Sequence, residues 1–260
     1  MKTMEPLLRV SNITKSFGGV TAVRDVSFSV FPGQITAVIG PNGAGKTTLF
    51  NMITSIIPPT SGNVYFQGID ITGKKPCDIA RMGVTRTFQN LQIFKNMTVL
   101  ENVMVGAHTR LKSGFVRSAL RLPSVAREEA AVHRTALSFL EQVGLGEQAY
   151  ELAGNLPYGS QRLLEIARAA AAQAKLILLD EPMAGLNPQE SRKLVSIIQN
   201  MRENGLTFLF VEHDMETVMS IADHIVVLDF GEKIAEGTPR EICNNPAVIA
   251  AYLGDEEVVV

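Results

Sequence analysis

Apolar residues in the second half of the chain occur in short uninterrupted runs. These runs are Leu176–Leu179, Phe208–Val211 and Ile225–Leu228. Unbroken apolar runs of this length are typical of parallel strands that are buried on both faces. We therefore predict a parallel sheet in this part of the chain, with helices between its strands.

The N-terminal part has a different pattern, in which apolar and polar residues alternate. Alternation covers Leu8–Ile13 and Val26–Val30, and a short strand bounded by glycines is predicted at Gly62–Gly68. A strand with one buried and one solvated face alternates in this way. The pattern predicts an antiparallel β region.

Helical spacing replaces both strand patterns in the middle of the chain. Apolar residues of Val125–Val143 recur at helical intervals, and Gly144–Gly146 ends the pattern. Glycine commonly follows the last turn of a helix. We expect a separable, mostly helical lobe from about residue 90 to 160.

Two later helices have readable starts. Asn187 is followed by Pro188 and, at the third helical position, by Glu190, a sequence that favours a capped helix start. Thr238 with Glu241 three residues later forms a capping-box pattern.

Charge and cysteine content exclude several function classes. The 260 residues carry a formal charge of −2, which gives no bulk electrostatic reason to expect a nucleic-acid partner. Cys77 and Cys243 are far apart and lack a metal-ligand pattern, so neither a disulfide framework nor a zinc site is expected. No apolar run approaches the ~20 residues that cross a bilayer, and the N-terminus lacks a signal-peptide core. We expect a soluble chain that can still dock on a membrane protein.

A complete phosphate-loop motif is the most specific chemical signal. The motif G-x-x-x-x-G-K-T begins at Gly40 and lies between the apolar run Gln34–Ile39 and a predicted helix start at Thr48–Ile53. Glycines let successive N–H groups and a helix N-terminus point at a phosphate. Lys46 would reach the β- and γ-phosphate oxygens, and the Thr47 hydroxyl would complete a Mg²⁺ shell. The alternative is a glycine-rich turn that binds no ligand.

A second signal is the pair Asp180–Glu181, which follows the apolar run Leu176–Leu179. In phosphate-loop proteins a strand-terminal Asp holds the Mg²⁺ shell. Glu181 lies just past the strand end, where it can turn toward the γ-phosphate and polarise water as a general base. Standing alone, the pair would more simply open a loop. Beside a phosphate loop, the catalytic interpretation is favoured.

The order of these motifs resembles the nucleotide-binding subunits of ABC transporters from near residue 8 to about residue 237. The resemblance implies an α/β fold: a P-loop NTPase of ABC type, with a mostly parallel RecA-like core sheet, an antiparallel β subdomain and an inserted helical subdomain. One nucleotide-binding domain would span residues 1–260. Its core and antiparallel subdomain would take 1–89 and 161–237, the helical subdomain 90–160, and C-terminal helices and a tail 238–260.

The same resemblance assigns roles to single residues. Glu181, His213 and Gln89 would be catalytic, with His213 contacting the γ-phosphate and Gln89 linking Mg²⁺ and the attacking water to the helical lobe. Phe17 would stack on adenine. The ATP-binding set implied by the family comprises Phe17, Val23, Gly40, Pro41, Asn42, Gly43, Ala44, Gly45, Lys46, Thr47 and Thr48. Mg²⁺ would be held by Thr47, Gln89 and Asp180. ATP and Mg²⁺ are the expected cofactors.

The family's signature segment aligns with Leu156–Arg162 and departs from its common Leu-Ser-Gly-Gly-Gln form. Pro157, Tyr158 and Ser160 replace the usual serine, first glycine and glutamine, whereas Gly159 remains. This segment offers a helix N-terminus to ATP bound by another subunit. Gly159 and Ser160 would therefore act in trans, so the resemblance implies a dimer with a second copy or with a related ATPase.

Within the family, Leu-Pro-Tyr-Gly in the signature, Ala184–Pro188 and a long basic segment over 107–127 resemble the LivG-type ATPases of branched-chain amino acid import. Such chains sit peripherally at the cytoplasmic face of the inner membrane. They work with transmembrane permease subunits and, indirectly, a solute-binding protein. Leu91, Ile93 and Phe94 would be apolar anchors for a permease helix.

Two other functions stay open at this point. One is an ATPase for lipid or lipopolysaccharide export, and the other is a soluble ABC ATPase that acts on nucleic acid or ribosomes. The basic residues Arg110, Lys112, Arg117, Arg121 and Arg127 fit either a solvated helical face or a phosphate or subunit contact.

Overall fold

The computed structural model describes residues 5–107 and 123–253. Its larger sheet has six strands in the order β10-β9-β3-β8-β7-β6. These are β3 (Ile35–Ile39), β6 (Val84–Arg86), β7 (Leu176–Asp180), β8 (Thr207–Val211), β9 (His224–Asp229) and β10 (Glu232–Gly237). All neighbours pair in parallel except β10, which runs antiparallel to β9. The predicted parallel sheet is confirmed.

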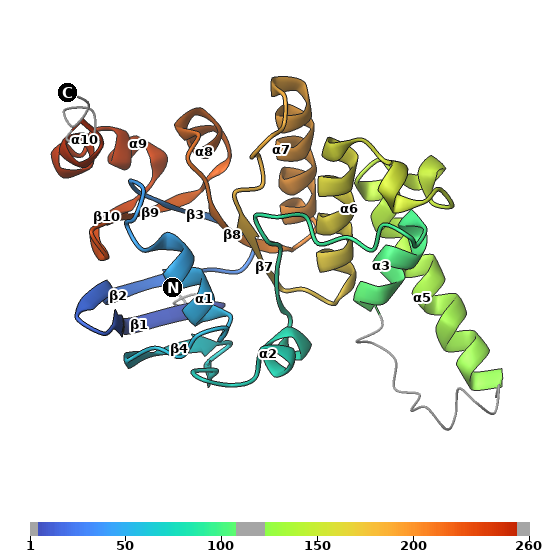
Figure 1. Ribbon diagram of the computed structural model, residues 1–260, viewed down its shortest axis with the longest axis horizontal. Helices are drawn as coiled ribbons and strands as arrows, with labels where there is room; N and C mark the ends of the chain where they lie inside the picture. Colours follow the sequence, from blue (N-terminus) through green and yellow to red (C-terminus); the bar gives the residue numbers. More distant parts are fainter. Residues whose placement is uncertain (1–4, 108–122, 254–260) are drawn as a thin grey trace.

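The second sheet is antiparallel and lies beside the first at the blue end of the molecule (Figure 1). It has the order β2-β1-β4-β5, from β1 (Leu8–Phe17), β2 (Val20–Val30), β4 (Ser61–Phe66) and β5 (Ile69–Asp70). The two strands predicted from alternation and the short strand predicted between Gly62 and Gly68 are therefore present, and β1 pairs with both β2 and β4.

Two apolar cores explain the unbroken runs of the parallel strands. On β7, Ile177 and Leu179 belong to the core under the helices, whereas Leu176 and Leu178 belong to the core shared with the antiparallel sheet. Strands β8 and β9 divide their side chains in the same way. Because neighbouring strand residues point to opposite faces, a strand covered on both sides must be apolar at every position.

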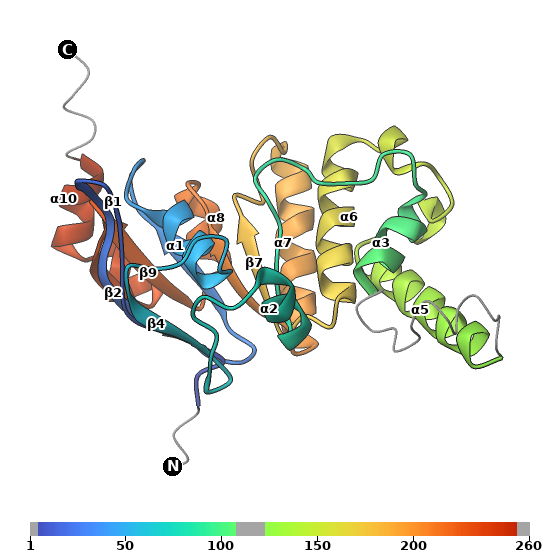
Figure 2. The ribbon, with the colours of Figure 1, turned by 60° about the horizontal axis from the view of Figure 1, so that its bottom comes forward.

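Helices fill both cores and extend the molecule to one side. Helix α1 (Lys46–Ile53) packs between the two sheets through Leu49 and Phe50. Helices α3 (Val99–Ala107), α5 (Pro123–Gln142) and α6 (Tyr158–Ala171) gather at the end opposite the antiparallel sheet (Figures 1 and 2). Two 3₁₀ turns, Gly146–Gln148 and Ala153–Asn155, join α5 to α6.

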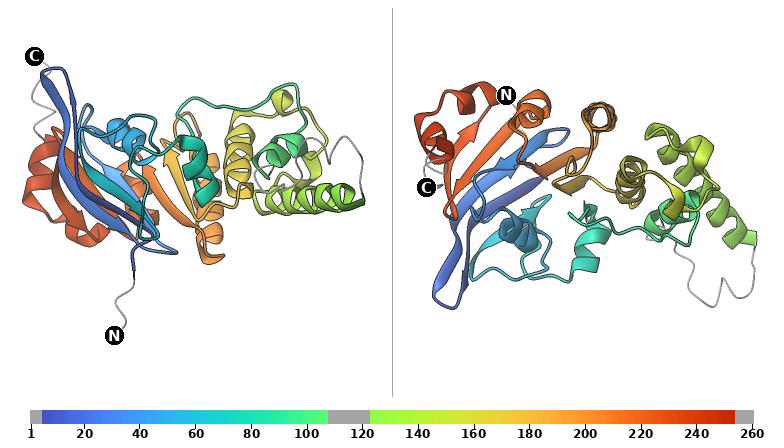
Figure 3. Two further views of the ribbon diagram at one scale, coloured as in Figure 1. Left: turned by 90° about the horizontal axis from the view of Figure 1, so that it is seen from below. Right: turned by 45° about the horizontal axis from the view of Figure 1, so that its top comes forward.

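The remaining helices are α2 (Pro76–Met82), α7 (Pro188–Glu203), α8 (Met215–Ile221), α9 (Pro239–Cys243) and α10 (Pro246–Leu253). Both predicted helix starts are confirmed: Asn187 is the N-cap of α7, where it forms a capping box with Glu190, and the predicted capping box of Thr238 with Glu241 begins α9. Helices α9 and α10 pack beside β10, at the far end from α5 (Figure 3).

The predicted helical lobe over 90–160 contains α3, α5 and both 3₁₀ turns. Helix α6 crosses the predicted boundary at 160/161, and one apolar core continues from α3 and α5 through α6 to β7 and β8. The division into subdomains stays a prediction. Arg110, Lys112, Arg117, Arg121 and the tail at 255–260 lie outside the described residues.

Candidate nucleotide site

The phosphate loop joins β3 to α1 in the centre of the parallel sheet, where β3 pairs with both β8 and β9. At two positions of the loop, neighbouring backbone lies so close that only glycine, which has no Cβ atom, fits. A Cβ atom on Gly40 would lie 2.0 Å from the Leu228 carbonyl oxygen, and one on Gly45 would lie 2.5 Å from the Ala22 oxygen. Gly45 also has φ 96° at the position just before α1, a conformation that favours glycine. The loop is thus pressed against neighbouring backbone, which fixes its shape.

A cleft of about 230 Å³ opens over this loop. Its walls include the predicted residues Asn42, Gly43, Ala44, Gly45, Lys46, Thr47 and Thr48, together with Glu181 and His213. The Lys46 ammonium donates to the carbonyl oxygens of Gly40 and Pro41 at 2.6 and 2.8 Å. Burial lowers the pKa of Lys46, and the nearby Glu181 carboxylate opposes this shift. The cleft therefore has one cation and the N-terminus of α1 along its floor, an arrangement that suits a phosphate.

The three predicted catalytic side chains meet at the edge of this cleft. Glu181 Oε1 lies 2.8 Å from His213 Nε2, and Gln89 Nε2 donates to Glu181 Oε2 at 2.9 Å. Each residue comes from a different segment: Gln89 follows β6, Glu181 follows β7 and His213 follows β8. Glu181 has φ 47°, in the left-handed region, so the chain turns immediately after the strand and aims this carboxylate away from the sheet.

The residues predicted for Mg²⁺ are less closely grouped. Thr47 is exposed in the cleft, whereas the Asp180 side chain is only 8% exposed and accepts a hydrogen bond from Arg86 at 2.7 Å. Gln89 contacts Glu181 rather than Asp180 among the bonds of the described residues. Hydroxyl, carboxylate and amide oxygens are the hard donors that Mg²⁺ prefers. No cluster of three or more His, Cys, Asp or Glu able to hold a metal occurs within 5–107 and 123–253. The donors therefore fit a Mg²⁺ whose remaining ligands are phosphate and water.

Phe17 and Val23 occupy different positions around the loop. Phe17 ends β1 with 49% of its surface exposed, and the Lys15 ammonium lies 5.1 Å from its ring centroid. Val23 is fully buried behind the loop, where its Cγ2 would be 3.1 Å from a Cβ on Gly45. Phe17 is therefore open to a planar ligand. Val23 supports the loop from behind, and its direct contact with a nucleotide stays a prediction.

The signature residues Gly159 and Ser160 lie in the first turn of α6 and do not line this cleft. The Tyr158 hydroxyl donates to the Ala184 carbonyl oxygen at 3.3 Å, which ties the signature to the loop that follows Glu181. Gly159 and Ser160 lie outside the cleft of their own chain. A nucleotide in this cleft could therefore contact signature residues only if a second subunit supplied them. Their role in trans stays a prediction.

Several buried charged residues of this region were missed by sequence reasoning. Arg162 is fully buried and donates to the carbonyl oxygens of Phe88 and Gln89 at 3.0 and 3.1 Å. Its NH1 also contacts Glu165 Oε2 at 3.1 Å, and burial raises the pKa of Glu165 despite this cation. Arg162 thereby holds the backbone on which Gln89 sits. The sequence offered one signal for these buried charges: Arg162 and Glu165 interrupt an otherwise apolar run in α6.

Glu212 is a further buried acid that the sequence did not single out. Its carboxylate accepts from the backbone N–H groups of Met183 and His213 at 2.8 and 3.0 Å. Burial raises the Glu212 pKa, while these two hydrogen bonds oppose the shift. Glu212 thus connects the segment after Glu181 to His213.

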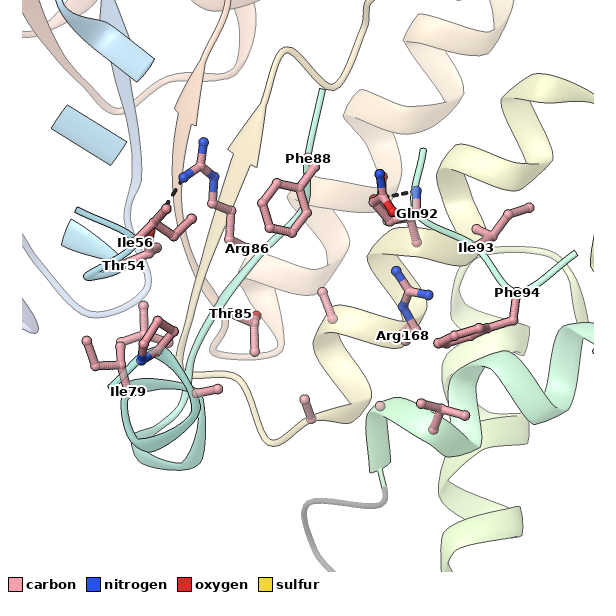
Figure 4. A pocket seen from close by; sticks show the side chains of 18 residues that line it. Thr54, Ile56, Ile79, Thr85, Arg86, Phe88, Gln92, Ile93, Phe94 and Arg168 are labelled. Carbon is pink, nitrogen blue, oxygen red and sulfur yellow. Dashed lines mark hydrogen bonds between the residues drawn. The ribbon is translucent and has the colours of Figure 1, made fainter. Parts of the chain in front are cut away.

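A groove of about 550 Å³ runs between α2, the 88–94 segment and α6 (Figure 4). Phe88, Ile93 and Phe94 contribute apolar side chains, and the Arg168 guanidinium lies 5.6 Å from the Phe94 ring centroid. Ile93 and Phe94, two of the predicted anchors, line the groove, whereas Leu91 does not. Arg86 reaches into the same groove from the side of β6 (Figure 4).

Among the described residues, no helix has the length and hydropathy needed to cross a membrane.

The family model for ABC transporters matches residues 23–184, and the model for branched-chain amino acid ATP-binding cassette transporters matches residues 232–258. The first of these ranges contains the phosphate loop, Gln89 and the Asp180–Glu181 pair.

Curated relatives extend the similarity over nearly the whole chain. The branched-chain amino acid transport ATP-binding protein BraF of Pseudomonas aeruginosa is 47% identical over 96% of this chain and 98% of its own length. The corresponding protein LivG of Escherichia coli K12 is 45% identical over 96% of this chain and 99% of its own length.

Solved structures agree with this assignment. The ADP conformation of MJ1267, an ATP-binding cassette of an ABC transporter, matches with a TM-score of 0.83 and 36% identity, covering 96% of this chain and 99% of that one. A dimeric post-hydrolysis state of the cassette MJ0796 bound to ADP and Pi matches with a TM-score of 0.74 and 26% identity, over 90% and 99% of the two chains. The predicted ABC-type P-loop fold is confirmed, and the chain belongs to the ABC transporter ATP-binding family, among its branched-chain amino acid transport members.

Proposed function

We propose that this chain is the ATP-hydrolysing subunit of an ABC importer for branched-chain amino acids. The observation that carries the proposal is the position of Glu181, whose two carboxylate oxygens contact His213 and Gln89 at the edge of the phosphate cleft. The similarity to LivG and BraF favours amino acid import over the lipid-export and nucleic-acid alternatives.

The loop residues would bind the nucleotide through N–H groups and the Lys46 ammonium. Thr47 and Asp180 would hold Mg²⁺ with Gln89 nearby, and the ion would neutralise charge on the γ-phosphate when bound. Glu181 would accept a proton from the attacking water. His213 and Gln89 fix the two oxygens of this base, so its orientation is set before the substrate arrives.

A second ATPase subunit would complete the site. Gly159 and Ser160 lie outside the cleft of their own chain, so their proposed contact with ATP needs another copy or a related chain. The dimeric state of MJ0796 with ADP and Pi supports such an assembly. Closure of the dimer would then precede hydrolysis.

The groove beside α6 is the proposed contact for a transmembrane permease subunit. It offers a half-exposed Phe94 ring with the Arg168 guanidinium over it, so an apolar surface lies beside a cation. Docking there would hold this chain at the cytoplasmic face of the inner membrane. A solute-binding protein would act only through the permease.

Substitution of Glu181 by Gln tests the assigned role. Gln retains hydrogen-bonding capacity toward His213 and Gln89 but is a far weaker base, so we expect steady-state ATP hydrolysis to fall by about 10²- to 10⁴-fold. Nucleotide binding, and ATP-dependent dimerisation measured by light scattering, should persist. The matched control is Glu147→Gln, an exposed acid on the turn after α5. Near-normal hydrolysis by the Glu181→Gln protein would refute the proposed function of this residue.

A further inference from the structure

Arg86 is a buried cation that none of the roles above requires. It ends β6, and its side chain is only 6% exposed. Its NH2 group donates to Asp180 Oδ2 at 2.7 Å, whereas NH1 donates to Asn51 Oδ1 at 2.7 Å and, over a longer distance, to Thr54 Oγ1 at 3.4 Å. Because the guanidinium is planar and its donors have fixed directions, these bonds define its orientation.

The surroundings of the guanidinium are largely aromatic. Its carbon lies 5.6 Å from the ring centroid of Phe50 and 5.3 Å from that of Phe88. The Nε atom has no hydrogen-bond partner among the described residues. A buried cation that leaves one donor unused is costly unless its remaining bonds are strong. Arg86 is therefore held by Asp180, Asn51, Thr54 and two rings.

Asp180 depends on Arg86 in return. The carboxylate is 8% exposed, and Arg86 is its only ion-pair partner within the described residues. With Oδ2 engaged by Arg86, the direction of Oδ1 is also fixed, because the carboxylate is planar. Asn51, on the helix that follows the phosphate loop, sets the position of Arg86 relative to Lys46 and Thr47. The contacts thus join the end of β7 to the helix bearing Thr47.

We propose that Arg86 is a positioning residue that orients the Asp180 carboxylate for the metal of a bound nucleotide and connects it to the groove beside α6. The proposal rests on the nucleotide site proposed above. It adds that Mg²⁺-linked nucleotide affinity depends on a side chain that also borders the groove. A partner in the groove that displaces Phe88 or Arg86 would then alter the metal site.

The test compares ADP binding with Mg²⁺ and ADP binding with EDTA, by calorimetry on the full chain. The dissociation constant in EDTA divided by the dissociation constant with Mg²⁺ measures how much the metal contributes to ADP affinity. We expect Arg86→Ala to reduce this ratio by about 10- to 100-fold, as for other residues that orient a metal ligand. The dissociation constant in EDTA should change little, since Lys46 and the loop are untouched.

Two conservative variants separate orientation from charge and guard against misfolding. Arg86→Lys keeps the charge but cannot bond Asn51 and Asp180 with the same planar group, so the ratio should still fall. Asn51→Ala removes one of the bonds that anchor Arg86 and leaves those to Asp180 and Thr54, so it should give a smaller decrease. Arg81→Ala is the matched control, because Arg81 pairs with Asp78 on the exposed surface of α2.

The outcomes are distinguishable. An unchanged or increased ratio in folded Arg86→Ala and Arg86→Lys proteins would overturn the proposal, as would equal losses with Mg²⁺ and with EDTA. If the unaltered chain failed to bind ADP under either condition, the proposed nucleotide site itself would be wrong.

Discussion

Glu181 owes its direction to a single backbone torsion. Its φ of 47° is unusual for a residue with a side chain and costs of order 1–3 kcal/mol. In a regular strand Glu181 would point to the face opposite Asp180. The turn instead brings its carboxylate to His213 and Gln89, which hold it from two sides.

Removing His213 should affect turnover more than binding. We expect His213→Ala to lower kcat for ATP by at least about 10²-fold, because one oxygen of the proposed base loses its partner. KM should change little, since phosphate contacts come from the loop. The control is His224→Ala, which removes a comparable His–Glu contact of 3.0 Å to Glu236 away from the cleft. A raised KM with unchanged kcat would contradict the expectation.

The sequence predicted the residues of the site better than the contacts between them. Glu181, His213 and Gln89 stand beside recognisable motifs, and the structure brings them together. Arg86 and Asp180 are 94 residues apart, and no local spacing rule links them. Arg162 was equally hidden, because its partners are carbonyl oxygens, which every residue carries.

Among the elements, the strands were predictable where burial decides the residue type. Strands β7, β8 and β9 each contain an unbroken apolar run because both faces are covered. Strand β6 was missed, since it has only three residues, Val84–Arg86, and two of them carry polar side chains that interrupt an apolar pattern. Helix starts were predictable for a different reason: a cap depends on bonds between residues two or three apart.

The contribution of one such cap to stability can be tested at the start of helix α7. The Asn187 side chain accepts from the N–H groups of Gln189 and Glu190, and the Glu190 carboxylate accepts from Asn187 N–H. We expect Asn187→Ala to lower the free energy of unfolding by about 0.5–2 kcal/mol in urea denaturation. Asn187→Asp retains the acceptor and places a negative charge at the helix N-terminus, so it should be nearly neutral or stabilising. Equal losses in both variants would show that the cap is not the cause.

At the scale of the whole molecule, the 86–94 segment connects the edge of the nucleotide cleft to the groove. Gln89 in this segment contacts Glu181, while Phe94 lines the groove. Arg162 holds the backbone carbonyl groups of Gln89 and of Phe88, which also lines the groove. A change in the groove therefore has a short, hydrogen-bonded route to the catalytic residues.

Substituting Phe94 tests the groove as a permease contact. Phe94 is 49% exposed, and its loss should remove an apolar anchor worth about 2 kcal/mol, or roughly 30-fold in affinity. We expect Phe94→Ala to recover less permease in co-purification while ADP binding stays unchanged. Phe230→Ala is the matched control, because Phe230 lies in the turn between β9 and β10 and is 88% exposed. Equal recovery of permease by the two variants would place the contact elsewhere.

The position of β3 between β8 and β9 has a consequence for the order in which the molecule is built during synthesis. The segment leading into the phosphate loop is fixed by bonds such as Gly33 N–H to Thr207, 174 residues away, and Ile35 N–H to Asp223, 188 residues away. At typical rates of translation the loop must wait on the order of ten seconds for those partners. A chain that stops before Thr207 would contain every residue of Gly40–Thr48 and lack the neighbouring strands that hold them in shape.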